Sequence, residues 1–97
     1  MFVGIIQFPK IKDGCEGNFL KWFEWSTSEL AKFDGFLSRK LLQVTGNEKN
    51  YVAILELKDA NTYRTIHHSK IHQVMFSRLV ELLDGIPKKV FHESLIP

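Results

Sequence analysis

Residues 36–57, FLSRKLLQV-TGNEKN-YVAILEL, decide the fold of this 97-residue chain. Residues 36–44 and 51–57 are rich in large apolar side chains, and residues 45–50 contain Gly46 and two asparagines, which is typical of a β-hairpin with a six-residue loop. The segment Tyr51–Leu57 is apolar at every position except Glu56, so we expect it inside a sheet rather than at an edge.

Upstream of this hairpin, the sequence predicts a strand and a helix. Residues 2–8 form a short apolar run that Pro9 ends. From Glu16 to Phe33, large apolar residues recur at spacings of three and four, which predicts a helix with one buried stripe. Ser26 leaves a gap in the middle of that stripe. Asp34-Gly35 closes the helix, because glycine readily adopts a left-handed conformation.

Downstream, two helices and a fourth strand follow. Asp59 can cap a short helix that continues to Ile66, and Ser69 can cap a second helix over 70–83. Asp84-Gly85 and Pro87 end the second helix, and residues 89–93 form a short strand. The order β-α-β-β-α-β predicts a single α+β domain, residues 1–97, of the ferredoxin-like type with an antiparallel sheet.

One face of such a sheet lacks helices and needs a cover. Along residues 36–44, simple alternation places Phe36, Ser38, Lys40 and Leu42 on one face and Leu37, Arg39, Leu41 and Gln43 on the other. Because neither set is cleanly polar, we expect a second copy of the chain to pack its sheet against this one, giving a homodimer.

Composition limits the classes of partner. The formal net charge is +2, from 13 basic and 11 acidic residues, which favours neither a nucleic-acid nor a membrane partner. The single cysteine, Cys15, cannot form a disulfide within the chain, and the apolar run at residues 2–6 is short for a signal peptide, so we expect the cytoplasm. Eight phenylalanines in so short a chain favour an aromatic pocket or interface.

Three histidines and a tyrosine are the strongest candidates for chemistry. Tyr63, His67 and His68 could polarise a substrate oxygen or move a proton at the mouth of a cavity, since imidazole titrates near neutral pH. His68 and His72 are four residues apart and would share a face of one helix. That pair lacks a third ligand at motif spacing, and Ser69 stands where H-E-x-x-H requires Glu, so we expect no metal site.

Three further positions are open to two interpretations. Arg78 lies at the edge of an apolar stripe, where it either extends to solvent or faces an anionic or phenolic ligand. Trp22 is expected in the core, whereas Trp25 either packs on a neighbouring element or forms the wall of a site for a flat ligand.

Other proteins of the same element order are disfavoured. An RNA-recognition module needs stacking aromatics and a leading basic residue in its third strand, and Asn50-Tyr51-Val52-Ala53-Ile54-Leu55 supplies neither. A copper chaperone needs C-x-x-C, which this sequence lacks.

The chain resembles the antibiotic biosynthesis monooxygenase (ABM) superfamily of dimeric α+β barrels, from about Phe2 to His92. The resemblance rests on short pieces in the family's order: Phe8-Pro9-Lys10, Phe19-Leu20-Lys21-Trp22, Asp34-Gly35-Phe36-Leu37, Tyr51-Val52 to Glu56, and Tyr63 with His67-His68-Ser69-x-x-His72. The family often has Pro-Gly-Phe where this chain has Asp34-Gly35-Phe36.

The resemblance implies a homodimer with a pocket between sheet and helices in each chain. Some members oxygenate quinol-like aromatic substrates with no metal, flavin or haem, whereas others degrade haem, isomerise small signalling molecules or have no known activity. The residues typical of haem degradation would fall near Gln7, Ile66 and Phe76, and all three differ, so the quinol interpretation is preferred. Asn61, Tyr63 and Arg78 are the possible counterparts of its polar pocket groups.

We therefore predict a cofactor-independent monooxygenase acting on a small aromatic substrate. The catalytic candidates are Tyr63, His67 and His68, and the substrate-binding candidates are Trp25, Asn61, His72 and Arg78. The alternative is a non-catalytic dimeric module that binds a small ligand or regulates a partner, which an apolar pocket without converging polar groups would favour.

Overall fold

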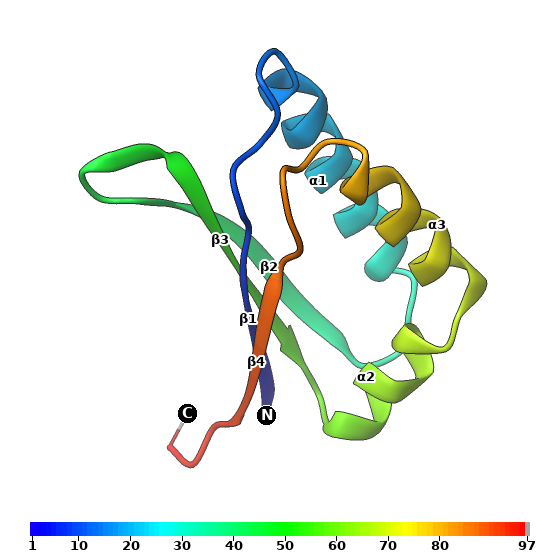
Figure 1. The fold of residues 1–97 in the computed structure, drawn as a ribbon. Helices are drawn as coiled ribbons and strands as arrows, with labels where there is room; N and C mark the ends of the chain where they lie inside the picture. Colours follow the sequence, from blue (N-terminus) through cyan, green and yellow to red (C-terminus); the bar gives the residue numbers. More distant parts are fainter. Residues whose placement is uncertain (97) are drawn as a thin grey trace.

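The computed structural model describes residues 1–96, with the side chains of residues 1–47 and 50–96. The elements are β1 (Phe2–Gln7), α1 (Glu16–Leu30), β2 (Phe36–Val44), β3 (Asn47–Leu57), α2 (Ala60–His67), α3 (Lys70–Val80) and β4 (Lys88–Glu93). The strands form one antiparallel sheet in the order β2-β3-β1-β4, and the helices cover one face of it (Figure 1). The α+β ferredoxin-like prediction and the interior position of β3 are confirmed.

The core lies between α1 and the central strands. Phe19 and Leu57 are fully buried, and Trp22 is 8% exposed. The indole Nε1 of Trp22 donates a hydrogen bond of 3.0 Å to the carbonyl oxygen of Met75, so α1 is tied to α3 by a polar contact within an apolar layer. The predicted caps are also present: Asp59 accepts from the backbone N–H of Thr62, and Ser69 accepts from that of His72.

Two helices end three residues earlier than their apolar periodicity predicts. The first ends at Leu30 rather than Phe33, because the N–H of Phe33 bonds to the carbonyl of Leu30 and tightens the last turn. The last helix ends at Val80 rather than Leu83, because Leu83 pairs with Ile11 in an isolated bridge. In both cases the apolar side chain still packs on the core after the helical backbone has ended.

The hairpin turn is tighter than expected. Strand β3 begins at Asn47, so the loop predicted at residues 45–50 is reduced to Thr45-Gly46. Gly46 has φ of +83°, a conformation that lets the chain reverse at once and returns the following residues to the ladder.

A β-bulge changes which side chains of β2 face the helices. Phe36 pairs with Leu57 but Ser38 pairs with Glu56, so Leu37 is an extra residue. The simple alternation predicted from the sequence is therefore wrong at Phe36, which shares the helix-facing side with Arg39 rather than the open side with Ser38.

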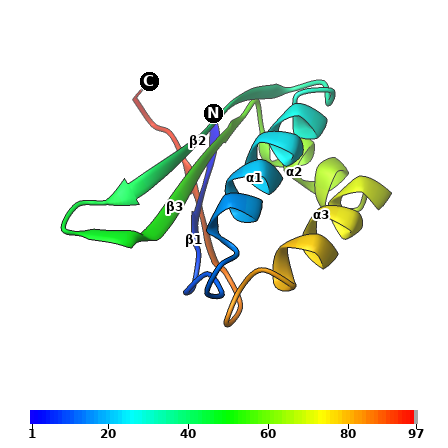
Figure 2. The ribbon, with the colours of Figure 1, turned by 90° about the horizontal axis from the view of Figure 1, so that it is seen from above.

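The opposite face of the sheet has no helix over it (Figure 2). Its central positions come from all four strands and are largely apolar: Val3, Ile5, Leu42, Val52, Ile54 and Val90. Val90 is 53% exposed and Leu42 is 44% exposed, so this face presents apolar surface to its surroundings. Among the helices of the described chain, none has the length and apolarity needed to cross a membrane.

Replacing Gly35 tests how tightly α2 packs on the start of β2. Its φ is +92°, and a Cβ there would lie 2.9 Å from Thr62 Cγ2, so Gly35→Ala adds a steric clash to backbone strain. We expect a loss of about 2–4 kcal/mol in the free energy of unfolding, measured by urea denaturation. Gly14→Ala is the control, since its φ is +79° but open space surrounds it, and it should cost only about 1–2 kcal/mol. Equal losses in the two variants would contradict the packing argument.

Candidate functional site

A cavity lies between the helices and the sheet. It offers about 70 Å³ to the centres of water-sized molecules, which is room for several waters or a small ligand. Its walls come from β1, β2, β3, β4 and all three helices, and they are mostly apolar, including Ile6, Phe8, Trp22, Leu55, Phe76 and Phe91. Four side chains bring polar groups to this wall: Arg39, Tyr63, His72 and Lys89.

Arg39 is the most unusual of these groups. Its Nη1 donates to Ser26 Oγ at 2.6 Å and to Thr27 Oγ1 at 3.1 Å, so it fills the gap that Ser26 leaves in the helix stripe. Its Cζ lies 4.2 Å from the ring centroid of Phe23, a cation–π contact. The buried Nε has no hydrogen-bond partner. Burial lowers the pKa of Arg39 to about 10, so the guanidinium is still charged at neutral pH.

Lys89 is the second cation of the cavity wall. It lies on β4 opposite Ile6 of β1, on the helix-facing side of the sheet. Partial burial is the larger cause and the charge of Arg39 the smaller cause that lower the pKa of Lys89, although the residue as a whole is exposed. The two cations therefore repel each other across the same small space.

Tyr63, His67 and His72 form a chain of rings from the cavity toward its rim. Tyr63 and His67 stack with centroids 5.5 Å apart, and the Tyr63 hydroxyl lies 3.4 Å from His67 Nδ1. His67 and His72 have centroids 4.8 Å apart. His67 is exposed, whereas Tyr63 and His72 line the cavity. This arrangement places a phenol between the cavity and an imidazole that meets solvent.

Burial shifts the pKa of His72 and the pKa of Tyr63 in opposite directions, and both side chains are neutral at neutral pH. Burial, followed by the charges of Lys89 and His67, lowers the pKa of His72 to about 4, so its imidazole is neutral at neutral pH. Burial raises the pKa of Tyr63, so its phenol keeps its proton. Both groups can therefore offer a hydrogen bond to a ligand without carrying charge.

The structure separates His68 from His72, in contrast to the prediction that they share one helix face. His68 is the residue that caps the end of α2, and His72 belongs to the first turn of α3, because Ser69 starts a new helix between them. His68 is exposed and its ring contacts that of His67, with centroids 5.5 Å apart. Among the side chains that the structure describes, those of residues 1–47 and 50–96, no three His, Cys, Asp or Glu gather in a geometry that could hold a metal ion.

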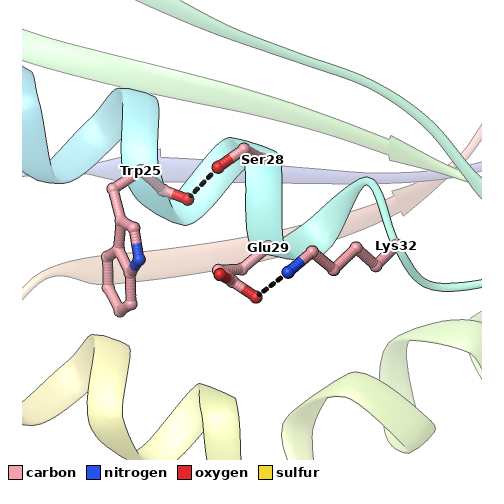
Figure 3. Close-up of polar contacts among 4 residues, drawn as sticks. All are labelled: Trp25, Ser28, Glu29 and Lys32. Carbon is pink, nitrogen blue, oxygen red and sulfur yellow. Dashed lines mark hydrogen bonds and ion pairs between the residues drawn. The ribbon is translucent and has the colours of Figure 1, made fainter.

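The other predicted binding residues lie elsewhere. Trp25 projects from α1 on the side of α3 (Figure 3), where the Arg78 guanidinium carbon lies 4.4 Å from the centroid of its ring. The two line a separate outer hollow between α1 and α3. Asn61 lies in the first turn of α2 beside a third hollow, with Asp59 and Thr62. Of the seven predicted site residues, the structure brings Tyr63 and His72 to the cavity and places His67 and His68 at its rim.

Arg39 and Lys89 are the cavity residues that the sequence reasoning missed as site residues. Ser26 was the available signal for Arg39, because a small polar residue in the middle of a buried stripe needs a partner. For Lys89 the sequence offered little, since each face of residues 88–93 mixes polar or charged side chains with an apolar one: Lys88, Val90 and His92 on one face, and Lys89, Phe91 and Glu93 on the other.

Comparisons with known proteins agree on the fold. No protein-family model matches the chain, and no curated protein sequence does so either. Solved structures do match: a Nitrosomonas europaea protein described provisionally as an antibiotic biosynthesis monooxygenase has a TM-score of 0.85 at 14% identity, covering 99% of this chain and 100% of that one. SnoaB, a cofactor-independent oxygenase from Streptomyces nogalater, has a TM-score of 0.83 at 17% identity, covering 99% and 95%.

A third match is a conserved protein from Methanosarcina mazei Go1, with a TM-score of 0.83 at 17% identity over 95% of this chain and 91% of that one. Structural neighbours of the antibiotic biosynthesis monooxygenase family thus cover nearly the whole chain. This chain has their ferredoxin-like fold.

The buried state of His72 should appear in the pH dependence of stability. Its pKa falls from 6.5 in the unfolded chain to about 4 in the folded one. The folded state therefore binds the proton more weakly, and the free energy of unfolding decreases as the pH drops through this interval. A full shift would be worth about 3 kcal/mol, and partial exposure of the ring reduces the expected effect to about 1–2 kcal/mol.

We compare how far the free energy of unfolding, measured by urea denaturation, falls between about pH 7 and about pH 4. This fall should be smaller by about 1–2 kcal/mol in His72→Asn than in the parent protein. NMR titration of the His72 ring provides the direct reading, and a midpoint near the ordinary value of 6.5 would contradict the assignment.

Proposed function

We propose that this protein is a cofactor-independent monooxygenase that acts on a small aromatic, quinol-like substrate in the cavity. The observation that carries this proposal is the junction of an aromatic cavity with the Tyr63–His67 pair, whose hydroxyl and Nδ1 lie 3.4 Å apart. Apolar rings can hold a flat substrate, and the pair can carry its proton to the rim. Distances of this length in an empty site commonly shorten when a ligand binds.

The proposed reaction needs no external reductant. A methylene carbon activated by a neighbouring phenol is oxidised to a carbonyl: R₂CH₂ and O₂ give R₂C=O and H₂O. The substrate supplies all four electrons, one oxygen atom forms the carbonyl, and the other leaves as water. Tyr63 and His67 remove the proton that makes the substrate electron-rich, and they return a proton to the departing oxygen. His68, in contact with His67 at the rim, would exchange that proton with solvent.

The fold gives this proposal independent support. SnoaB, which shares the fold over 99% of this chain, is described as a cofactor-independent oxygenase. The proposal extends to this chain the general monooxygenase chemistry of the family. That the substrate is aromatic is also part of the proposal. The sole cysteine, which needs no oxidising compartment, supports a cytoplasmic location.

We also propose that two copies pair through the open face of the sheet. Its apolar positions lie on all four strands, and Val90 and Leu42 are each more than two-fifths exposed in the single chain. A second sheet packed on this face would remove that apolar surface from water.

The second candidate function is ligand binding without catalysis. It is favoured by the cavity itself, which is small, at about 70 Å³, and mostly apolar. In that case Tyr63 and His72 would serve as orienting hydrogen-bond partners only, and a ligand would bind without any consumption of oxygen.

Oxygen uptake by the metal-stripped protein, tested with a panel of anthrones and hydroquinones, distinguishes the two functions. We expect uptake above the buffer rate, with a decrease of about 10²-fold in Tyr63→Phe and His67→Ala, because positioned proton transfer is typically worth that much. His92→Ala is the control, since His92 pairs with Val3 on the open face of the sheet. Saturable binding of a panel compound with no uptake would favour the binding module.

The oligomeric state is measured by sedimentation equilibrium. We expect a dimer of twice the chain mass of 11.3 kDa, and Ile54→Lys should shift it to monomer because it places a charge at the centre of the buried face. Lys21→Glu, a change of charge at an exposed residue of α1 on the opposite side of the sheet, is the control and should remain dimeric. A parent protein of single-chain mass would contradict the proposal.

A further inference from the structure

The cavity holds two cations and no carboxylate. Arg39 and Lys89 both line it, and none of its other wall residues is Asp or Glu. The ion pairs found in the described residues lie elsewhere, at Met1–Glu93, Lys10–Asp13 and Lys32–Glu29. Two positive charges therefore face a largely apolar space without a counter-charge from the described chain.

Such an arrangement is costly in the empty protein. Removing a cation from water is unfavourable unless other groups solvate it. Arg39 is solvated in part by Ser26, by Thr27 and by the face of Phe23, but its Nε has no partner. Lys89 is exposed and keeps contact with solvent, and its Nζ lies 6.0 Å from the centroid of the Phe76 ring.

An anion in the cavity would relieve this cost. It would receive charge-assisted hydrogen bonds from the guanidinium and the ammonium, which are stronger than neutral ones, in a site where apolar walls reduce screening. The remaining polar groups are compatible with a single acid function, because His72 is neutral and the Tyr63 phenol keeps its proton. Both can donate to an anionic oxygen.

We propose that the ligand of this cavity is an aromatic anion, whose one ionised oxygen acid, a carboxylate or a phenolate, lies between Arg39 and Lys89 while its ring contacts the aromatic wall. This inference rests on the proposed function only for the location of the ligand site, since it specifies the charge of the substrate and not its oxidation. It predicts that an ionised aromatic compound binds more tightly than its neutral counterpart of the same size.

Neighbouring residues on the same strands provide matched controls. Lys88 directly precedes Lys89 in the sequence, and Lys40 directly follows Arg39. Both Lys88 and Lys40 are exposed. They alternate with the cavity cations and face the open side of the sheet. Removing either one changes the net charge of the chain by the same amount while leaving the cavity intact.

Isothermal titration calorimetry with benzoate and its neutral isostere benzamide tests the inference. We expect benzoate to bind at least about tenfold more tightly than benzamide, since one hydrogen bond to a charged group is worth that much. Arg39→Met and Lys89→Met should each reduce benzoate affinity by about tenfold or more and leave benzamide affinity within about twofold. Lys40→Met and Lys88→Met should bind benzoate as the parent does.

Because Lys89 is exposed, Lys89→Met is the safer variant if Arg39→Met does not fold, which circular dichroism would reveal. Equal affinities for the two probes, or benzoate binding that is insensitive to Lys89→Met, would overturn the anion inference. So would the absence of binding by both probes. None of these results decides the proposed function, because oxygen uptake with neutral anthrones measures that separately.

Discussion

A guanidinium buried under a helix must find substitutes for water, and the helix α1 provides them for Arg39. Ser26 is fully buried and donates its own hydroxyl proton to the carbonyl of Phe23 at 3.1 Å, so its oxygen is free to accept from Arg39. The rings of Phe23 and Trp22 cover the planar face of the cation. The spacing of α1 above the sheet thus depends on Ser26, whose small side chain leaves room for the long side chain of Arg39.

The charge of Arg39 adds to the electrostatics of the cavity. Burial is the largest cause of the lowered pKa of Lys89 and of His72; the charge of Arg39 adds to it at Lys89, and the charges of Lys89 and His67 add to it at His72. A neutral imidazole with so low a pKa is a poor base at neutral pH, so His72 is suited to orient a ligand rather than to take its proton. His67 is exposed and is joined to the cavity through Tyr63.

The sequence was a good guide wherever one local signal decided the structure. The caps at Asp59 and Ser69 and the buried stripe of α1 were predicted correctly, because capping chemistry and helical periodicity act within a few residues. The faces of β2 were not, because the bulge at Leu37 is visible only in the pairing with β3. No local sequence pattern indicates this bulge, so none indicates that Arg39 and Phe36 lie on the same side of the sheet.

The same limit explains which site residues were placed correctly. Tyr63 and His72 reach the cavity from α2 and α3, whereas Lys89 reaches it only because β4 pairs with β1 at the edge of the sheet. Strand β4 is an edge strand: Lys89 and Phe91 face the cavity, and Val90 between them faces the open side. Neighbouring residues of this one strand thus belong to opposite faces of the sheet. The cation that completes the cavity is held by the strand whose other side is least covered.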